Sequence, residues 1–186
     1  MTDKQDAILD ATLELVSERG FHDAPTSLIA QEAGVGVGTI YRYFDNKEDL
    51  IDELYKKLKL QLARAMLVDY STDLPLRERF RRIWINTARY YIDHPLETAF
   101  MEQYANSPFL KPETANIYAD YFRPVIEFIE NGVYEGVLKD LPPELFGSLT
   151  LEVAISLAKK HRDGEIVLDD GALERAVDAC WDAIKR

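Results

Sequence analysis

The sequence predicts an all-α fold of about nine helices. Apolar residues recur at intervals of three and four through most of the 186 residues, whereas the alternating pattern of β-strands is almost absent. Glycines and prolines stand between the periodic segments, where helices are expected to end. Apolar residues make up 47% of the chain and charged residues 30%, a balance typical of a globular protein with a buried core.

Three helices are expected at the N-terminus, the second and third of them short. The first runs from about residue 4 to 19 and carries one apolar face. The second, "SLIAQEA", has Thr26 or Ser27 as its N-cap and is closed by Gly34. The third follows after three residues and covers about 37–44. A three-residue turn between two short helices is the arrangement of a helix-turn-helix motif.

A longer helix and a set of apolar helices follow. Asp45 or Asn46 is the expected N-cap of the long helix, and Glu48 and Asp49 in its first turn complement the helix dipole. Pro124 lies inside an aromatic-rich periodic stretch, where it predicts a kink. The expected helices of this part cover about 47–66, 80–92, 96–105, 112–134, 143–161 and 170–185.

Charge and composition exclude several classes of function. The formal net charge is −11, and residues 1–62 hold seven basic against twelve acidic residues, which argues against nucleic acid as a partner. Cys180 is the single cysteine, so an intramolecular disulfide and a multi-thiolate zinc site are excluded. We expect no metal, no cofactor and no catalytic residues. No apolar run approaches the roughly 20 residues of a membrane span, and the N-terminus lacks signal-peptide features, so we expect a cytoplasmic protein.

The stretch "GVGVGTIYRYF" has two possible interpretations, a phosphate-binding loop and a helix-turn-helix. A phosphate loop follows a buried strand, and its last glycine precedes Lys and Ser or Thr. Here the preceding segment is helical, and Gly38 is followed by Thr39 and Ile40. The helix-turn-helix interpretation fits better, because Gly34 suits the turn while Ile40 and Phe44 face inward at helical spacing.

The segments "PTSLIAQEA" and "GVGVGTIYRYFDNKEDLI" resemble the DNA-binding domain of the tetracycline-repressor (TetR) family of bacterial transcriptional regulators, over roughly residues 4–58. The resemblance implies a homodimer that binds a palindromic double-stranded DNA operator with its N-terminal helices and a small-molecule effector with its C-terminal helices. It implies a helix-turn-helix domain at 1–46 and a ligand-binding and dimerisation domain at 47–186, with the fourth helix as connector.

Positions of contact with DNA follow from the same resemblance. Small groups would meet base edges, and hydroxyls and cations would hold phosphates. Two alternatives remain open: Tyr41 or Tyr43 partly covers the three-helix core, and Lys47 merely solvates the start of its helix. The implied phosphate contacts are Thr26, Ser27, Tyr41, Arg42, Tyr43 and Lys47, and the implied base contacts are Val37, Gly38 and Thr39.

The C-terminal half resembles the regulatory domain of multidrug-responsive members of the family. This predicts an aromatic-lined pocket for an apolar or cationic effector, with a cation stacking on Trp84. The apolar stripe of the last helix predicts dimerisation through the last two helices. The expected pocket residues are Tyr55, Trp84, Tyr91, Phe122 and Leu151, and the expected dimer residues are Ala154, Leu157, Val177, Cys180 and Trp181.

Together these features predict a ligand-responsive repressor and no enzymatic activity. The negative charge of residues 1–62 leaves one alternative open, a helical small-molecule-binding protein that has lost DNA binding.

Overall fold

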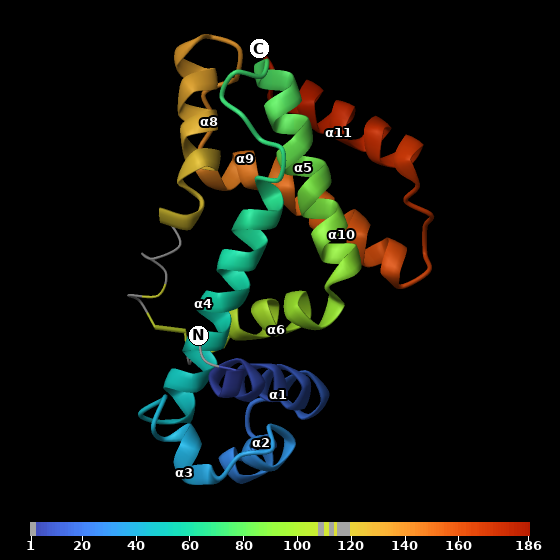
Figure 1. The fold of residues 1–186 in the computed structure, drawn as a ribbon. Coiled ribbons are helices and arrows are strands. Elements are labelled where there is room, and N and C mark those ends of the chain that lie inside the picture. The colour runs from blue at the N-terminus through green and yellow to red at the C-terminus, as the bar shows by residue number, and fades with distance from the viewer. Residues whose placement is uncertain (1–2, 108–109, 112–113, 115–119) are drawn as a thin grey trace. The chain divides into compact units, whose positions relative to one another are not determined.

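The computed structural model describes residues 3–107, 110–111, 114 and 120–186 (Figure 1). Helices dominate this part of the chain, so the all-α prediction is confirmed. The β-pairing recorded among these residues is one isolated bridge between Leu138 and Lys185. The chain forms two compact units: an N-terminal unit of Met1–Leu60 with Pro95–Tyr118, and a C-terminal unit of Gln61–His94 with Ala119–Arg186.

The N-terminal unit is built on a small helical core. Figure 1 shows α6 running beside α1 within this unit, and these two helices are in contact. Ile8, Ile29, Ile40 and Leu50 are at most 1% exposed, so each helix from α1 to α4 contributes to the core. The helices are α1 (Asp3–Arg19), α2 (Thr26–Glu32), α3 (Val37–Ile40), the first part of α4 (Lys47–Met66) and α6 (Pro95–Ala105).

Aromatic rings of α6 complete this core. The ring of Phe21, which follows α1, lies 5.7 Å from that of Phe100 and 6.2 Å from that of Tyr104, both in edge-on geometry. Tyr104 also contacts Tyr55 of α4, with ring centroids 4.5 Å apart. Such aromatic pairs stabilise beyond the area that they bury. The N-terminal unit therefore includes α6 and about the first four turns of α4, and its limits differ from the expected 1–46.

The buried carboxylate of Asp52 in α4 binds Tyr104 of α6 and Thr114, which follows α6 in sequence. Asp52 is 2% exposed, and its Oδ1 accepts hydrogen bonds from the Tyr104 hydroxyl at 2.9 Å and from Thr114 Oγ1 at 2.7 Å. Its Oδ2 lies 2.9 Å from Lys56 Nζ. Burial alone would raise the pKa of Asp52, but the bonds from Lys56, Thr114 and Tyr104 outweigh it and hold the pKa below its ordinary value. Asp52 is thus a charged and fully bonded core residue.

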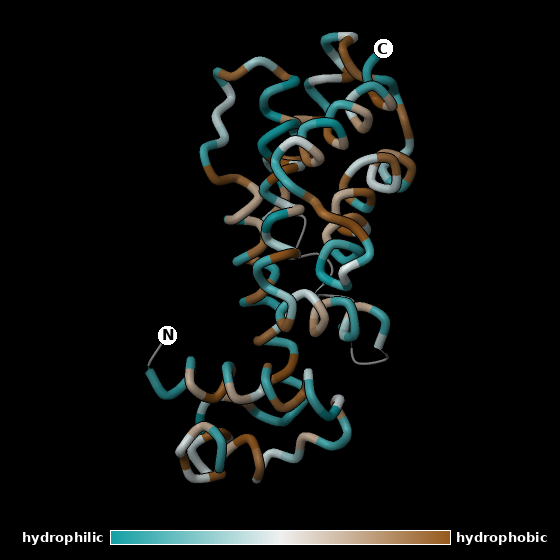
Figure 2. Tube along the Cα trace, turned by 90° about the vertical axis from the view of Figure 1, so that its right-hand side faces the viewer, coloured by the Kyte–Doolittle hydropathy of each residue, from teal (hydrophilic) through white to brown (hydrophobic). Residues whose placement is uncertain are grey.

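The C-terminal unit packs around α5 (Leu76–Asp93), which contacts α8 (Arg123–Tyr134), α10 (Leu151–Arg162) and α11 (Asp170–Ile184). A further short helix, α9 (Pro143–Leu149), packs against α10 and α11. Polar and apolar residues are interspersed along each of these helices, as the hydropathy colouring of Figure 2 shows. In the described part of the chain, no helix has both the length and the apolar character of a membrane span.

Three expected helix boundaries are wrong. Pro124 lies in the first turn of α8, where the missing amide of a proline is tolerated, and Phe122 before this helix is a turn residue; the proline therefore starts a helix and does not lie inside one. The expected helix 143–161 is divided at Thr150, whose backbone (φ −130°, ψ −86°) departs from helical values. At α2 the N-cap is Pro25, and neither Thr26 nor Ser27 caps the helix, because Thr26 is already its first helical residue.

The apolar stripe of α11 is covered by its own chain. Val177, Cys180 and Trp181 are 1–8% exposed, and α11 packs on α5 and α9. Ala154 of α10 is also fully buried. These four residues are therefore packed within their own chain, whereas Leu157, the fifth residue expected at the dimer contact, is half-exposed; dimerisation through these residues stays a prediction. Helix α5 covers the apolar stripe of α11, and the sequence of α11 alone does not reveal which element covers it.

Candidate nucleic-acid interface

The turn between α2 and α3 is set by Gly34. Its φ of +64° lies in the left-handed region, which costs a glycine little and other residues more. The Val35 amide donates to the Ala30 carbonyl at 2.9 Å and the Gly34 amide to the Gln31 carbonyl at 3.1 Å, which is the Schellman ending of a helix. This ending redirects the chain, and α3 begins at Val37 after two further residues.

The short helix α3 presents one buried and one exposed face. Ile40 and Phe44 are 1% and 4% exposed and anchor the segment in the core, as the sequence predicts. Val37 is 39% exposed, Gly38 is exposed, and Thr39 is half-exposed. The helix ends at Ile40, earlier than expected, and the chain continues as turns to Tyr43. Three small side chains at the start of α3 are thus accessible together.

Hydroxyl groups from two elements converge next to this surface. The Tyr41 hydroxyl lies 3.5 Å from Thr26 Oγ1, and Tyr41 is 52% exposed. Ser27, beside Thr26 at the start of α2, is exposed. Because neither hydroxyl of α2 is used as a helix cap, both remain available as donors to an external acceptor.

Arg42 supplies positive charge at the end of α3. It is exposed, and no ion pair joins it to any residue that the structure describes. Tyr43 is 37% exposed, its ring lies 6.4 Å from that of Phe44, and it also lines a hollow with Asp45 and Asp49. Tyr43 therefore retains both of its interpretations, as a partial cover of the core and as a surface contact.

Lys47 has a structural partner that the sequence does not reveal. Its ammonium donates to the main-chain carbonyl of Phe21, which ties the start of α4 to the segment after α1. Burial lowers the pKa of Lys47, with Glu48 and Asp23 acting in the opposite direction. The start of α4 is further fixed by Asn46, whose Oδ1 accepts from the Asp49 amide at 2.8 Å, as the sequence predicts.

None of the cavities recorded among the described residues is lined by more than one of the expected pocket residues. Tyr55 belongs to the N-terminal unit, whereas Trp84, Tyr91, Phe122 and Leu151 belong to the C-terminal unit. Trp84 is 0% exposed, and its indole N–H donates to the Thr150 carbonyl at 3.1 Å. It is therefore placed as a core residue.

An apolar cavity of about 10 Å³ lies within the C-terminal unit and has Leu151 in its wall. Trp84, Tyr91 and Phe122 are not among its lining residues. Phe80, Ile83, Val125, Phe128 and Phe146 form most of its wall.

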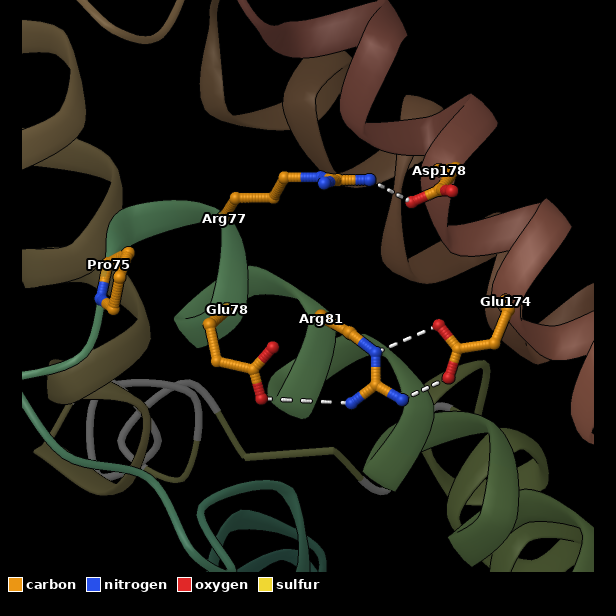
Figure 3. Close-up of a pocket in the computed structure, with 6 residues that line it drawn as sticks. All are labelled: Pro75, Arg77, Glu78, Arg81, Glu174 and Asp178. Atoms are coloured by element: carbon orange, nitrogen blue, oxygen red, sulfur yellow. Dashed lines mark hydrogen bonds and ion pairs between the residues drawn. The ribbon is translucent and has the colours of Figure 1, made fainter.

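A polar hollow of about 370 Å³ opens on the surface between α5 and α11 (Figure 3). Its charged groups face one another: Arg77 Nη2 lies 2.7 Å from Asp178 Oδ1, and Arg81 Nε lies 2.8 Å from Glu174 Oε2. The Arg81 guanidinium lowers the pKa of Glu174. Each of these charges already has a partner, so the ion pairs of this hollow join α5 to α11.

One charged residue of the C-terminal unit was missed by the sequence reasoning. Arg79 is 6% exposed, although arginine is rarely buried without a partner. Arg79 lies four residues before Ile83 in α5. This helical spacing places it on the apolar face that Ile83 also occupies. That spacing was the signal that could have identified it.

Known proteins match the chain along its whole length. Residues 8–54 match the family described as "Bacterial regulatory proteins, tetR family", and residues 75–185 match "Tetracyclin repressor-like, C-terminal domain". A protein of Haemophilus influenzae called an uncharacterized HTH-type transcriptional regulator is 26% identical over 185 residues, which cover 100% of this chain and 97% of that protein.

Two solved structures have the same fold. A putative TetR-family regulator from Vibrio parahaemolyticus is 36% identical and superposes with a TM-score of 0.89, over 98% of this chain and 99% of that one. A TetR-family regulator from Marinobacter aquaeolei is 26% identical with a TM-score of 0.93, over 98% and 96% of the two chains.

Proposed function

Because the chain belongs to the tetracycline-repressor (TetR) family of bacterial transcriptional regulators, we propose that it is a ligand-responsive repressor that binds a palindromic operator as a homodimer. The family consists of DNA-binding regulators and not of enzymes. A repressor acts on chromosomal DNA, so the proposal places the protein in the cytoplasm.

The proposal of DNA binding rests on the surface at the start of α3. Val37, Gly38 and Thr39 are accessible at the start of α3, and the adjoining hydroxyls of Thr26 and Tyr41 lie close together. A helix start with small side chains fits into a major groove, while flanking hydroxyls and cations suit phosphates. In this arrangement Lys47 acts through its bond to Phe21, by holding α4 in place.

The negative charge of residues 1–62 is compatible with this surface. Residues 33–44 contain no acidic side chain and include Arg42. Several carboxylates of the unit are ion-paired away from α3: Asp6 and Asp10 with Lys57 of α4, and Asp52 with Lys56. Because salt screens charges over about 8–10 Å, the local charge at the contact outweighs the sum over the unit.

Substitution of Arg42 by Ala is expected to weaken binding to all duplexes alike and to make the dependence of affinity on salt less steep, because one phosphate contact is lost. Substitution of Thr39 by Ala should instead change the preferred operator sequence, at about 1–3 kcal/mol for a lost base contact. Fluorescence anisotropy at several salt concentrations measures both, with an operator selected from random duplexes by the wild type.

Arg64, an exposed residue of the last turn of α4, provides the control for removing one positive charge. Arg64→Ala should keep the affinity and the salt slope of the wild type. If Arg42→Ala does the same, the assignment of Arg42 fails. If the wild type selects no duplex even at low salt, the alternative of a small-molecule-binding protein without DNA binding is favoured.

Dimerisation is proposed through the outer side of the last two helices. Ala172, Ala176, Ala179 and Ala183 follow one another at intervals of four, three and four along α11, and all are half-exposed or exposed. This spacing keeps them on one stripe, and small side chains let two helices approach closely. Leu157 of α10 is half-exposed and extends the apolar surface.

Light scattering at micromolar concentration is expected to give the mass of two chains, about twice 21.3 kDa. Ala179→Glu should shift this mass towards one chain, because it places a charge at the centre of the contact. Val68→Glu is the control, since Val68 is an exposed apolar residue far from α11 in sequence. Equal masses for both variants would contradict the proposed surface.

A further inference from the structure

The arginines of α5 differ in one respect, the presence of a carboxylate partner. The helix carries five of them, and four lie on the exposed or half-exposed side. Arg77 pairs with Asp178, Arg81 with Glu174 and Arg82 with Glu78. Arg89 likewise pairs with Asp170, at 3.1 Å. The fifth, Arg79, has no carboxylate within ion-pair distance among the residues that the structure describes.

Arg79 is also the most buried of the five, at 6% exposure. Its Nε and Nη2 both donate to the Tyr70 hydroxyl, at 2.9 Å and 2.5 Å. Its guanidinium carbon lies 5.2 Å from the centre of the Tyr70 ring and 5.5 Å from that of Phe128. No hydrogen bond is recorded for Nη1 among the described residues.

An unneutralised charge in this position is costly. An arginine is always protonated in a protein, and a buried charge is normally paired. A neutral hydroxyl and two aromatic rings offset only part of the lost hydration. The four exposed or half-exposed arginines, for which a partner matters less, have carboxylates, while the buried one lacks an anion among the described residues.

The apolar cavity of the C-terminal unit adjoins this charge through Phe128. The Phe128 ring contacts the Arg79 guanidinium and also lines the cavity, together with Phe80, which follows Arg79 in sequence. Val125, Phe146 and Leu151 complete an apolar wall, in which Thr150 is the one polar residue among the described residues. A buried cation and an apolar cavity thus share one wall.

We propose that the effector of this protein is an amphipathic carboxylic acid, whose carboxylate pairs with Arg79 and whose apolar body enters the cavity between α5, α8 and α9. This inference rests on the proposed ligand-responsive function and names the chemical class of its ligand. A planar guanidinium binds a carboxylate through two parallel hydrogen bonds from two of its nitrogens, and Nη1 together with the second N–H of Nη2 can supply them. The cationic effector expected from the sequence would be repelled by Arg79.

Binding of such a ligand must change the structure of the unit. The cavity of about 10 Å³ holds one water molecule at most. An apolar chain therefore has to displace Val125 and Phe128 of α8 or Phe146 of α9 from α5. A ligand that fits only this displaced arrangement shifts the protein towards it, which is the requirement for an effector.

Three probes with an eight-carbon alkyl chain and different head groups test whether the site prefers a carboxylate. They are octanoate, octylammonium and 1-octanol, each used below the concentration at which it aggregates. Tryptophan fluorescence reports binding, because Trp181 contacts Phe80 at 5.6 Å between ring centres and both tryptophans lie in the C-terminal unit. Octanoate should bind on the order of ten-fold more tightly than either other probe and should raise the melting temperature. Octylammonium binding as tightly as octanoate would overturn the proposal.

Substitution of Arg79 locates the site. Arg79→Met should lose on the order of ten-fold in octanoate affinity while 1-octanol binds as before, and its melting temperature without ligand should equal or exceed that of the wild type. Arg77→Met makes the same change two residues away on the solvent side and should leave octanoate binding unaltered. Arg79→Lys keeps the charge and serves if Arg79→Met does not fold; it should weaken octanoate binding without removing the preference over 1-octanol.

Octanoate binding to Arg79→Met at wild-type strength would overturn the proposal, as would an equal loss in Arg77→Met. Because all of these measurements use the protein without DNA, they are independent of operator binding. Failure to bind an operator would contradict the repressor function and leave the carboxylate site standing. Operator binding without a preference for octanoate would contradict the site alone.

Discussion

Replacing Trp84 by Ala is expected to lower the free energy of unfolding by about 3–5 kcal/mol, as for other large aromatic residues removed from protein cores. Trp84 is completely buried, and α5 around it packs on α10. The Thr150 carbonyl would lose the indole donor but keep the Val153 amide at 3.1 Å, so most of the loss comes from packing. Urea unfolding followed by circular dichroism measures the change without depending on the removed fluorophore.

Trp84→Phe is the matched control, because it retains an aromatic ring and removes the N–H. It should cost less than Trp84→Ala, about 1–3 kcal/mol. If Trp84→Ala is as stable as the wild type and loses only its response to ligand, then Trp84 is a wall of the effector pocket, as the sequence predicts, and our placement of it in the core fails.

Replacing Asp52 by Ala is expected to lower the free energy of unfolding by about 3 kcal/mol, because it leaves buried donors without their acceptor. The Tyr104 hydroxyl and Thr114 Oγ1 both donate to Asp52, while Lys56 keeps Glu53 as a second partner at 2.8 Å. Asp52→Asn retains one acceptor oxygen and should lose less. Chemical denaturation at neutral pH, compared among the three proteins, measures these losses.

The dependence on pH follows from the direction of the pKa shift. The folded state holds the pKa of Asp52 below its ordinary value, so the ionised group stabilises the folded state at all pH values above about 4. This contribution declines as the pH falls through the lower, folded pKa. The difference in stability between the wild type and Asp52→Asn should therefore shrink on acidification below pH 4. A difference that grows on acidification would contradict the role assigned to this carboxylate.

Local patterns predicted the helices and the turn of the N-terminal unit well. Gly34 and Asn46 act through bonds to residues within five positions, and Ile40 and Phe44 follow helical periodicity, so each can be recognised from neighbours in sequence. The boundary at Thr150 could not be recognised, because the apolar periodicity continues on both sides of it.

The missed contacts join residues far apart in sequence. Asp52 binds residues 52 and 62 positions later, and Lys47 binds a carbonyl 26 positions earlier. The same reason explains why the partner of α11 could not be predicted: its stripe is apolar whether it faces α5 or a second chain. Periodicity identifies a face that must be buried, but the partner that buries it depends on the tertiary fold.

The position of α6 in the N-terminal unit determines how this protein can be cut and recombined. A fragment that ends after the helix-turn-helix lacks Phe100 and Tyr104, and so exposes the ring of Phe21 and leaves Asp52 without its tyrosine. A chimera that takes the C-terminal unit of a relative has to exchange Gln61–His94 and Ala119–Arg186 while retaining Pro95–Tyr118. Such a graft requires three junctions between the two chains. A simple division into an N-terminal and a C-terminal half would suggest a single junction.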